Sequence, residues 1–287
     1  MKNLQEILEI ARPITWNAAD ILRGYYQGTR RQDLDIQYKN SSTDDPVTAA
    51  DIAVSNYLIE NLQAELGSED FGYISEETYQ GEQVKNEFVW IIDPLDGTRD
   101  FIDKTGEYAI HIGLVKENRP ILALVAVPEA EKIYYATLGN GTFVETRTGD
   151  IQRLQVSTQN KIEDLTVLVS RSHRSKPLDY ILSKLPCQTH KNVGSIGCKI
   201  ATIVEQQADV YISLSGKSAP KDWDIAAPEL ILSEAGGRYT RYDNSTLLYN
   251  TEDINKWGGL LASNGKYHDI LCQEATNLLK EFENIAT

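Results

Sequence analysis

One short run of residues constrains this chain more than any other. The apolar residues Phe88 to Ile92 are followed directly by Asp93-Pro94-Leu95-Asp96-Gly97-Thr98. The apolar residues predict a buried strand, and the proline and glycine after them predict a sharp turn at its end. Two carboxylates and a hydroxyl are therefore expected at the carboxyl end of a strand, where ligands bind in α/β sheets.

Carboxylates as close as Asp93 and Asp96 repel each other and take up protons unless a cation lies between them. We therefore interpret the run as a divalent-metal site that handles phosphate. A plain turn is the structural alternative, because Asp, Pro and Gly are common turn residues. The haloacid dehalogenase pattern also has Asp-Gly-Thr after an apolar strand, but its two aspartates are one residue apart. Pro94 and Leu95 both intervene here, so a covalent aspartyl-phosphate is not expected.

The charge balance limits the possible partners. The chain has 287 residues, a formal net charge of −14 and a pI near 4.8. A nucleic acid or an anionic membrane would require basic surface, so we expect neither as a partner. A phosphate substrate would need metal ions and a few well-placed cations to screen the protein's own field.

Cysteine usage and the N-terminal residues indicate the compartment. Cys187, Cys198 and Cys272 are widely spaced, which predicts free buried thiols in a reducing environment. Residues 1–6 carry charge where a signal peptide needs an apolar core, and no apolar run is long enough to span a bilayer. We therefore expect a cytoplasmic protein, either a monomer or a homodimer.

Hydrophobic periodicity predicts a first half that begins with helices. One helix is expected over 4–26, with Pro13 kinking it or marking its true start, and a second after an N-cap at Thr48. A loop or hairpin over 38–45 separates them. An antiparallel meander is expected to follow, with a tight turn at 139–141. The predicted strands of this meander cover 109–115, 121–127 and 132–138, and a separate strand that ends at 75 is expected before it.

The second half alternates strands and helices, which predicts an α/β lobe. The strands are expected at 165–169, 209–212 and 260–262, and the helices at 176–184, 194–206, 223–235 and 266–282. The polar stretch 145–162 is the expected seam. The fold class is therefore α/β, with an α+β N-terminal lobe of residues 1–155 that carries most metal ligands and an α/β C-terminal lobe of residues 156–287.

Acidic residues recur at the ends of the predicted elements. Asp51 lies in the first turn of a helix, Glu76 and Glu77 follow a strand, and Asp224 lies at a helix start. A helix N-cap would explain Asp224 alone, and a solvated loop would explain the two glutamates. As one set with Asp93 and Asp96, oxygen ligands without His or Cys favour Mg²⁺ or Mn²⁺ over zinc.

The order of these motifs resembles that of the inositol monophosphatase superfamily. The resemblance rests on Trp90–Thr98, on Glu76-Glu77 before it and on Trp223-Asp224-Ile225-Ala226-Ala227 after it, and it covers the chain from Pro46 to Gly237. It implies a layered αβαβα sugar-phosphatase fold. It also implies a magnesium-dependent phosphatase that Li⁺ inhibits.

Within that superfamily the chain most resembles the 3′(2′),5′-bisphosphate nucleotidases, the CysQ or PAP phosphatase branch. Segments 169–173 and 194–199 resemble that branch's substrate-binding segments, and Lys221 precedes Trp223-Asp224 as it does there. Fungal members have a serine three residues before the lysine and an arginine after the Asp-Val-Tyr strand. Here Ser195 is four residues before Lys199, and Ser213 stands where the arginine would be.

The resemblance implies a role for each site residue. Glu76, Asp93 and the carbonyl of Leu95 would hold one metal ion, and Asp93, Asp96 and Asp224 a second. Glu76 and Asp51 would form a weaker third site, and Asp51 and Thr98 would orient and deprotonate the attacking water. The substrate-binding residues would be Gly97, Thr98, Arg171, His173, Ser195, Lys199 and Lys221.

The cations also have simpler interpretations. His173 could be a structural or solvated loop residue, Arg171 a surface cation and Lys199 a solvated helix lysine. As a phosphate partner, Lys199 would act together with the helix N-terminal amides at 195–197. No suitably spaced aspartate supports a triad with His173, so we expect no protein nucleophile.

The expected reaction is Mg²⁺-dependent hydrolysis of 3′-phosphoadenosine 5′-phosphate (PAP) to AMP and phosphate, with the sulfated nucleotide PAPS as a second substrate. One alternative is an inositol monophosphatase or fructose-1,6-bisphosphatase of the same superfamily. A second is a sensor that binds nucleotide or metal without turning it over. The complete acidic set argues against the sensor, which could lose the catalytic base and still bind.

Overall fold

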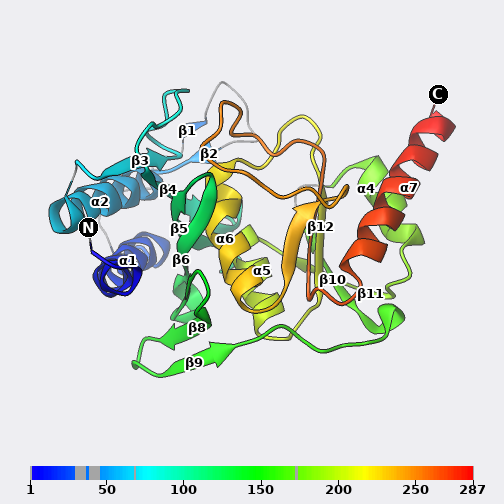
Figure 1. Ribbon diagram of the computed structural model, residues 1–287, viewed down its shortest axis with the longest axis horizontal. Coiled ribbons are helices and arrows are strands. Elements are labelled where there is room, and N and C mark those ends of the chain that lie inside the picture. Colours follow the sequence, from blue (N-terminus) through cyan, green and yellow to red (C-terminus); the bar gives the residue numbers. More distant parts are fainter. Residues whose placement is uncertain (1, 30–36, 39–45, 68, 172–173, 287) are drawn as a thin grey trace.

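Two β-sheets and three pairs of helices alternate in five layers in the computed structural model, which describes residues 2–29, 37–38, 46–67, 69–171 and 174–286 (Figure 1). Helices α1 (Leu4–Tyr26) and α2 (Ala49–Leu66) cover the outer face of the first sheet. Helices α5 (Ile196–Val204) and α6 (Asp222–Glu234) fill the space between the sheets. Helices α4 (Lys176–Lys184) and α7 (His268–Ala286) cover the second sheet. The predicted αβαβα layering is confirmed.

The first sheet has seven strands in chain order, from β3 to β9. They are β3 (Phe71–Ser75), β4 (Phe88–Asp96), β5 (Ala109–Lys116), β6 (Arg119–Val127), β7 (Lys132–Thr137), β8 (Gly141–Thr146) and β9 (Ile151–Leu154). The meander is antiparallel from β4 onward, as predicted, but β3 pairs with β4 in parallel.

The second sheet has the order β11-β10-β12-β14-β13. Its strands are β10 (Thr166–Ser170), β11 (Thr189–Val193), β12 (Val210–Leu214), β13 (Arg238–Arg241) and β14 (Gly259–Ser263). Strands β11, β10 and β12 run parallel to one another. Strand β14 pairs antiparallel with β12, and β13 pairs antiparallel with β14. Strands β10, β12 and β14 and the helices α4, α5, α6 and α7 lie where the sequence predicted them, whereas β11 and β13 were not predicted.

Short elements complete the described chain. They are the antiparallel pair β1 (Gln37–Tyr38) and β2 (Pro46–Val47), helix α3 (Thr98–Ile102) and the 3₁₀ turns η2 (Pro128–Ala130) and η3 (Ile162–Asp164). Residues 39–45 of the predicted loop or hairpin lie outside the described residues.

Three predictions about the chain's organisation need correction. Pro13 does not mark a helix start, because α1 begins at Leu4, where the Asn3 side chain accepts from the Glu6 amide and the Glu6 carboxylate accepts in return from the Asn3 amide. The polar stretch 145–162 is not only a seam, since it contains β9, the last strand of the first sheet. The lobe boundary at 155/156 stays a prediction.

The third correction concerns the first motif. Pro94 does not end the strand, because β4 continues to Asp96 with a register shift against β5 between Asp93 and Asp96. Strand β3 pairs only as far as Ile92, so Pro94 lies beyond that ladder, where its missing N–H costs no pairing with β3. The turn comes at Gly97, whose φ of +89° suits glycine.

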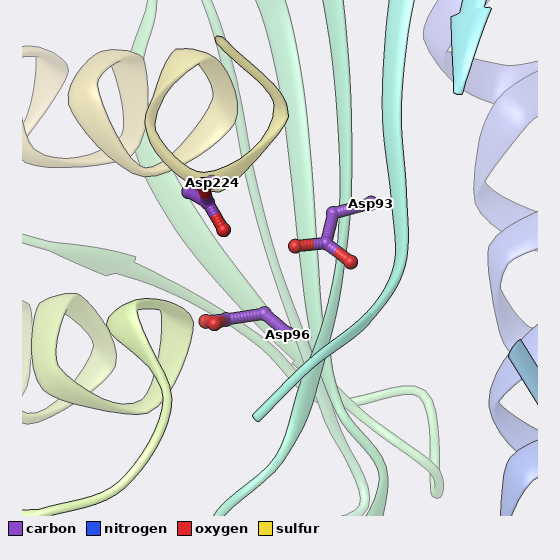
Figure 2. A group of neighbouring side chains, drawn as sticks. All are labelled: Asp93, Asp96 and Asp224. Atoms are coloured by element: carbon purple, nitrogen blue, oxygen red, sulfur yellow. The ribbon is translucent and has the colours of Figure 1, made fainter. Parts of the chain in front are cut away.

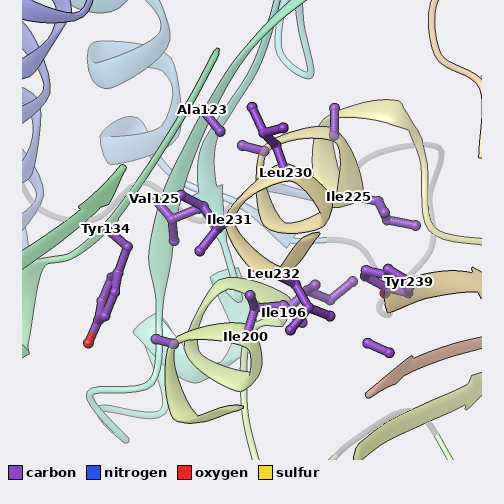
Figure 3. Close-up of a cluster of buried hydrophobic side chains, with 14 of the residues drawn as sticks. Ala123, Val125, Tyr134, Ile196, Ile200, Ile225, Leu230, Ile231, Leu232 and Tyr239 are labelled. Carbon is purple, nitrogen blue, oxygen red and sulfur yellow. The ribbon is translucent and has the colours of Figure 1, made fainter. Parts of the chain in front are cut away.

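Strand β4 is buried along its whole length because helices cover both faces of the sheet. Val89 and Ile91 belong to the core that contacts α5 and α6, whereas Trp90 and Ile92 belong to the core under α1 and α2. Figure 3 shows the first of these cores, with Ala123 and Val125 of β6 facing Leu230 and Ile231 of α6. This alternation directs Asp93 to the α5/α6 side, where the site lies.

Candidate metal and active site

Three carboxylates from two distant segments converge between the first sheet and α6. Asp93 and Asp96 end β4, Asp224 lies in the first turn of α6, and one oxygen of each lies within 4.8 Å of the others (Figure 2). The register shift in β4 brings Asp96 to this side although it is three residues from Asp93. The sequence predicted this grouping, and the structure brings the three residues together.

Ionisation of Asp93 and Asp224 is unfavourable in the folded protein without a cation. Burial, followed by the charges of Glu76, Asp96 and Asp224, raises the pKa of Asp93 well above its usual value. Burial, followed by Glu76 and Asp96, raises the pKa of Asp224 to about 7. Asp93 Oδ1 accepts a hydrogen bond from the Leu95 amide at 3.0 Å, whereas buried Oδ2 has no hydrogen-bond partner among the described residues.

Asp96 is held more firmly than its two neighbours. Its Oδ2 accepts a 2.9 Å hydrogen bond from the Gly197 amide at the start of α5 and lies 3.2 Å from Nε2 of His111 on β5. Burial alone would raise the pKa of Asp96, but His111, the Gly197 amide and Lys199 together lower it below its usual value. A buried oxygen-only set with one unpartnered oxygen fits a divalent cation such as Mg²⁺.

Asp51 lies next to Thr98. Asp51 Oδ2 accepts from the amide and the hydroxyl of Thr48 at 2.8 and 2.6 Å, which caps α2, and the hydroxyl of Thr98 lies 3.3 Å from Oδ1. The Thr98 hydroxyl also lies 3.2 Å from the Leu95 carbonyl oxygen. Burial raises the pKa of Asp51 to about 7, against the lowering effect of Thr48, and Glu77 and Glu76 add to the rise.

Glu76 lies at the same end of the sheet. Its amide donates to the Ile92 carbonyl at 3.1 Å, which continues the β3–β4 pairing, and its charge raises the pKa of Asp93, Asp224 and Asp51. Glu76 is therefore placed close enough to the three-carboxylate cluster to act on its titration.

The α5 segment closes one side of the site. Ser195 is the N-cap of α5, with its hydroxyl accepting from the Cys198 amide at 2.9 Å. A Cβ on Gly97 would lie 3.0 Å from the Ser195 Cβ, so glycine allows the turn after β4 to approach α5. Gly97 and Ser195 were both predicted to contact substrate, and they lie beside each other next to Asp96.

Lys199 is buried, so the simpler interpretation of a solvated helix lysine is wrong. Only 2% of the residue is exposed, and Nζ donates to the carbonyls of Gly194 and Ser195 and lies 5.1 Å from the centre of the Tyr211 ring. Burial lowers the pKa of the ammonium group, and Asp96 opposes that shift. Its predicted contact with a phosphate stays a prediction.

Arg171 follows β10 and is half-exposed. Its guanidinium group lies 2.6 Å from Glu107 and 3.6 Å from Asp100, and Glu107 also accepts from the Gly194 amide at 2.6 Å. Lys221, not Asp224, is the N-cap of α6, so the simpler interpretation of Asp224 as an N-cap is wrong; Asp224 is the third residue of the helix, and its Oδ2 accepts from the Lys221 amide at 2.5 Å.

Three further expectations concern His173, the cysteines and membrane-spanning helices. His173 lies outside the described residues. The predicted free thiols are confirmed, since Cys187, Cys198 and Cys272 are all unpaired and buried. Among the described helices, none combines the length and the apolar character that crossing a bilayer requires.

Sequence reasoning missed His111, Glu107 and Asp100, which contact the predicted site residues Asp96 and Arg171. His111 interrupts the apolar part of β5, residues 109–115, and is fully buried. A lone polar residue inside a buried strand was the available signal, because a buried polar group needs a partner. Nothing local in the sequence indicated which residue that partner is.

Comparisons with known proteins agree with this geometry. A model of the inositol monophosphatase family matches residues 3–280. The 3′(2′),5′-bisphosphate nucleotidase CysQ of Salmonella typhimurium is 30% identical over 252 residues, which are 87% of this chain and 95% of that protein.

Two solved structures share the fold. The inositol monophosphatase from Anabaena superimposes with a TM-score of 0.74 at 25% identity, covering 96% of this chain and 97% of that one. An IMPase/NADP phosphatase in complex with Mg²⁺ and phosphate superimposes with a TM-score of 0.77 at 21% identity, covering 95% and 96%. The resemblance predicted from the motifs is confirmed.

Proposed function

This chain belongs to the inositol monophosphatase family of metal-dependent phosphatases, and we propose that its substrate is PAP, which it hydrolyses to AMP and phosphate. The converging carboxylates Asp93, Asp96 and Asp224 carry the phosphatase part of the proposal. The nucleotide part rests on the 30% identity with the Salmonella typhimurium nucleotidase. PAPS, which has the same 3′-phosphate, is the second proposed substrate.

The proposed metal ligands are Asp93, Asp96 and Asp224, with Glu76 and the Leu95 carbonyl. All five groups offer oxygen, and the buried Oδ2 of Asp93 lacks a hydrogen-bond partner among the described residues, which suits Mg²⁺ or Mn²⁺. When bound, the cations supply an acidified water and neutralise charge on the phosphoryl group. The known Mg²⁺ and phosphate complex of a similar fold supports this choice of cation.

Asp51 is the proposed general base. A carboxyl group with a pKa of about 7 can accept a proton from water near neutral pH, and the Thr98 hydroxyl beside it can orient that water. The water oxygen attacks phosphorus, the bond from phosphorus to the 3′ oxygen breaks, and the leaving oxygen takes up a proton from solvent. No covalent bond to the protein forms.

The remaining proposals concern the phosphate that is not cleaved. Arg171 and Lys221 are the proposed partners of the 5′-phosphate, with His173 and Lys199 as further candidates. Gly97, Thr98 and Ser195 are proposed to contact the phosphate that leaves. We further propose that Li⁺ inhibits turnover by occupying one of the cation positions, and that the protein acts in the cytoplasm as a monomer or homodimer.

Phosphate release from PAP, inositol 1-phosphate and fructose 1,6-bisphosphate at one Mg²⁺ concentration tests the proposal. We expect kcat/KM for PAP to exceed that for the other two by at least about tenfold, the effect of one charge-assisted contact. A preference for inositol 1-phosphate would favour the alternative that the Anabaena structure represents. Binding of Mg²⁺ and PAP without any phosphate release would identify a sensor instead.

A further inference from the structure

One oxygen of Asp96 is fixed by two contacts from different elements. The Gly197 amide of α5 donates to Oδ2 at 2.9 Å, and His111 Nε2 of β5 lies 3.2 Å from the same oxygen, within ion-pair distance but without the geometry of a hydrogen bond. Both contacts fall on Oδ2, which leaves Oδ1 to turn toward a cation. The orientation of this carboxylate is therefore set by the protein before any cation binds.

The other side of the His111 ring contacts the segment that carries Asp224. Nδ1 lies 3.3 Å from the carbonyl oxygen of Trp223, the residue before Asp224. The ring is fully buried in β5 and therefore has no freedom to turn away. A single side chain thus joins the end of β4 to the first turn of α6, which are the two segments of the carboxylate cluster.

Gly197 leaves room for the His111 ring because it has no Cβ. A Cβ at position 197 would lie 2.4 Å from His111 Nε2, 2.7 Å from the Ala109 Cβ and 3.0 Å from Val125 Cγ1. Real Cβ atoms essentially never approach closer than 3.0 Å. Any larger residue at 197 would push α5 away from β5 or displace the ring, and either movement would disturb a contact to Asp96.

We propose that His111 and Gly197 act as a coupled pair of positioning residues that sets the spacing of the metal ligands Asp96 and Asp224. His111 bridges the two segments, and Gly197 leaves room for the ring while its amide holds the same carboxylate oxygen. The inference rests on the proposed metal-dependent function. Groups that orient metal ligands in this way typically contribute about 10- to 100-fold to metal affinity.

The first test measures Mg²⁺ binding by calorimetry, and Mg²⁺-induced thermal stabilisation, in His111→Leu and His111→Gln. Leu fills the space but lacks the ring nitrogen that faces Asp96 Oδ2, so Mg²⁺ affinity should fall by about tenfold or more. Gln can donate to Asp96 and should recover most of that loss. His268→Leu is the matched control, since His268 is equally buried but contacts Thr240 and Ser263. It should lower stability and leave Mg²⁺ affinity unchanged.

The second test is a double-mutant cycle of Gly197→Ala with His111→Ala. Gly197→Ala should weaken Mg²⁺ binding by about tenfold in the wild-type background and by a clearly smaller factor once the ring is gone, when only the Ala109 and Val125 side chains still crowd the new Cβ. Equal effects of Gly197→Ala in both backgrounds would overturn the coupling. Mg²⁺ affinity within twofold of wild type in His111→Leu would overturn the positioning role. If His111→Leu fails to fold, the Mg²⁺ affinities of His111→Gln and of the cycle variants still test the positioning role.

The outcome also separates this inference from the proposed function. Wild-type protein that does not bind Mg²⁺ would refute the metal-dependent function itself. Wild-type protein that binds Mg²⁺ together with unaffected variants would refute only the pairing of His111 with Gly197. Absence of PAP hydrolysis would leave the binding results interpretable, because calorimetry does not require turnover.

Discussion

The hydroxyl of Thr98 lies 3.3 Å from the Asp51 carboxylate although 47 residues separate the two in the chain. The contact joins the first turn of α2 to the start of α3, immediately after β4. Asp51 also caps α2 through Thr48, so the carboxylate is rigidly placed before it meets Thr98. The same residue therefore fixes a helix end and faces the site.

Asp51→Asn should lower kcat for PAP by roughly 10²–10⁴-fold, the usual contribution of a general base. The fold should survive, because the amide oxygen of Asn can still accept from Thr48. Phosphate release and the melting temperature measure both effects. Asp103, an exposed carboxylate at the end of α3, supplies the control: Asp103→Asn should change neither phosphate release nor the melting temperature. Full activity of Asp51→Asn would exclude the proposed base.

Asp93→Asn should abolish activity and remove the thermal stabilisation by Mg²⁺, since a neutral amide cannot replace a buried anionic ligand. In EDTA the variant should melt at or above the wild-type temperature, because it no longer buries a negative charge beside Glu76, Asp96 and Asp224. Scanning calorimetry in EDTA and in Mg²⁺ gives the two melting temperatures. Near-normal turnover at saturating Mg²⁺ would contradict the assignment of Asp93 as a ligand.

The stability of the metal-free protein should fall as pH rises from about 4 to 7. The pKa values of Asp51 and Asp224 are raised from 3.8 to about 7 in the folded state, so the folded protein binds more protons than the unfolded chain in this interval. Their stabilising contribution is complete below pH 3.8 and is lost as pH passes through about 7. Protein in EDTA should therefore melt lower at pH 8 than at pH 6, by about 3 °C or more.

Added Mg²⁺ should reverse this trend, because it competes with protons for the same carboxylates. The rise in melting temperature on adding Mg²⁺ should be larger at pH 8 than at pH 6. A rise that is independent of pH would place the bound ion away from Asp51, Asp93 and Asp224.

Arg171→Gln should raise KM for PAP by about tenfold, because a charge-assisted contact contributes roughly 1.5–3 kcal/mol. Hydrolysis of inositol 1-phosphate should be unchanged, since that substrate has no second phosphate. Arg174→Gln, which removes a neighbouring arginine paired with Asp179, is the matched control. If both substrates lose activity equally, the main role of Arg171 is to hold Glu107.

Lys199→Met should reduce turnover of PAP and of inositol 1-phosphate alike. The ammonium group donates to the carbonyls of Gly194 and Ser195, and these would be left without that donor. We expect the free energy of unfolding to fall by roughly 1–3 kcal/mol, measured by urea denaturation. A loss confined to PAP, with stability unchanged, would instead support the direct phosphate contact that the sequence predicted.

Local patterns predicted most elements because the signals lie within a few residues. Thr48 with Asp51 is a capping pair three residues apart, and the continuous apolar run Phe88–Ile92 indicated a buried strand. In the two large sheets, the strands β8, β9, β11 and β13 were missed. β9 is largely exposed and β11 has only one buried residue, so neither shows the apolar pattern on which strand prediction depends.

The sequence by itself determined the oxygen-only set of candidate ligands through residue type and most helices and strands through short-range periodicity, and the resemblance of its motifs to the inositol monophosphatase superfamily implied the order of the layers. Only the tertiary structure decided how the set is assembled. Asp93 and Asp96 are three residues apart and would face opposite sides of a regular strand, and a register shift against β5 returns Asp96 to the α5/α6 side. The burial of Lys199 and the contact of His111 with Asp96 were likewise decided by packing between elements, since their partners lie in segments that local sequence does not relate.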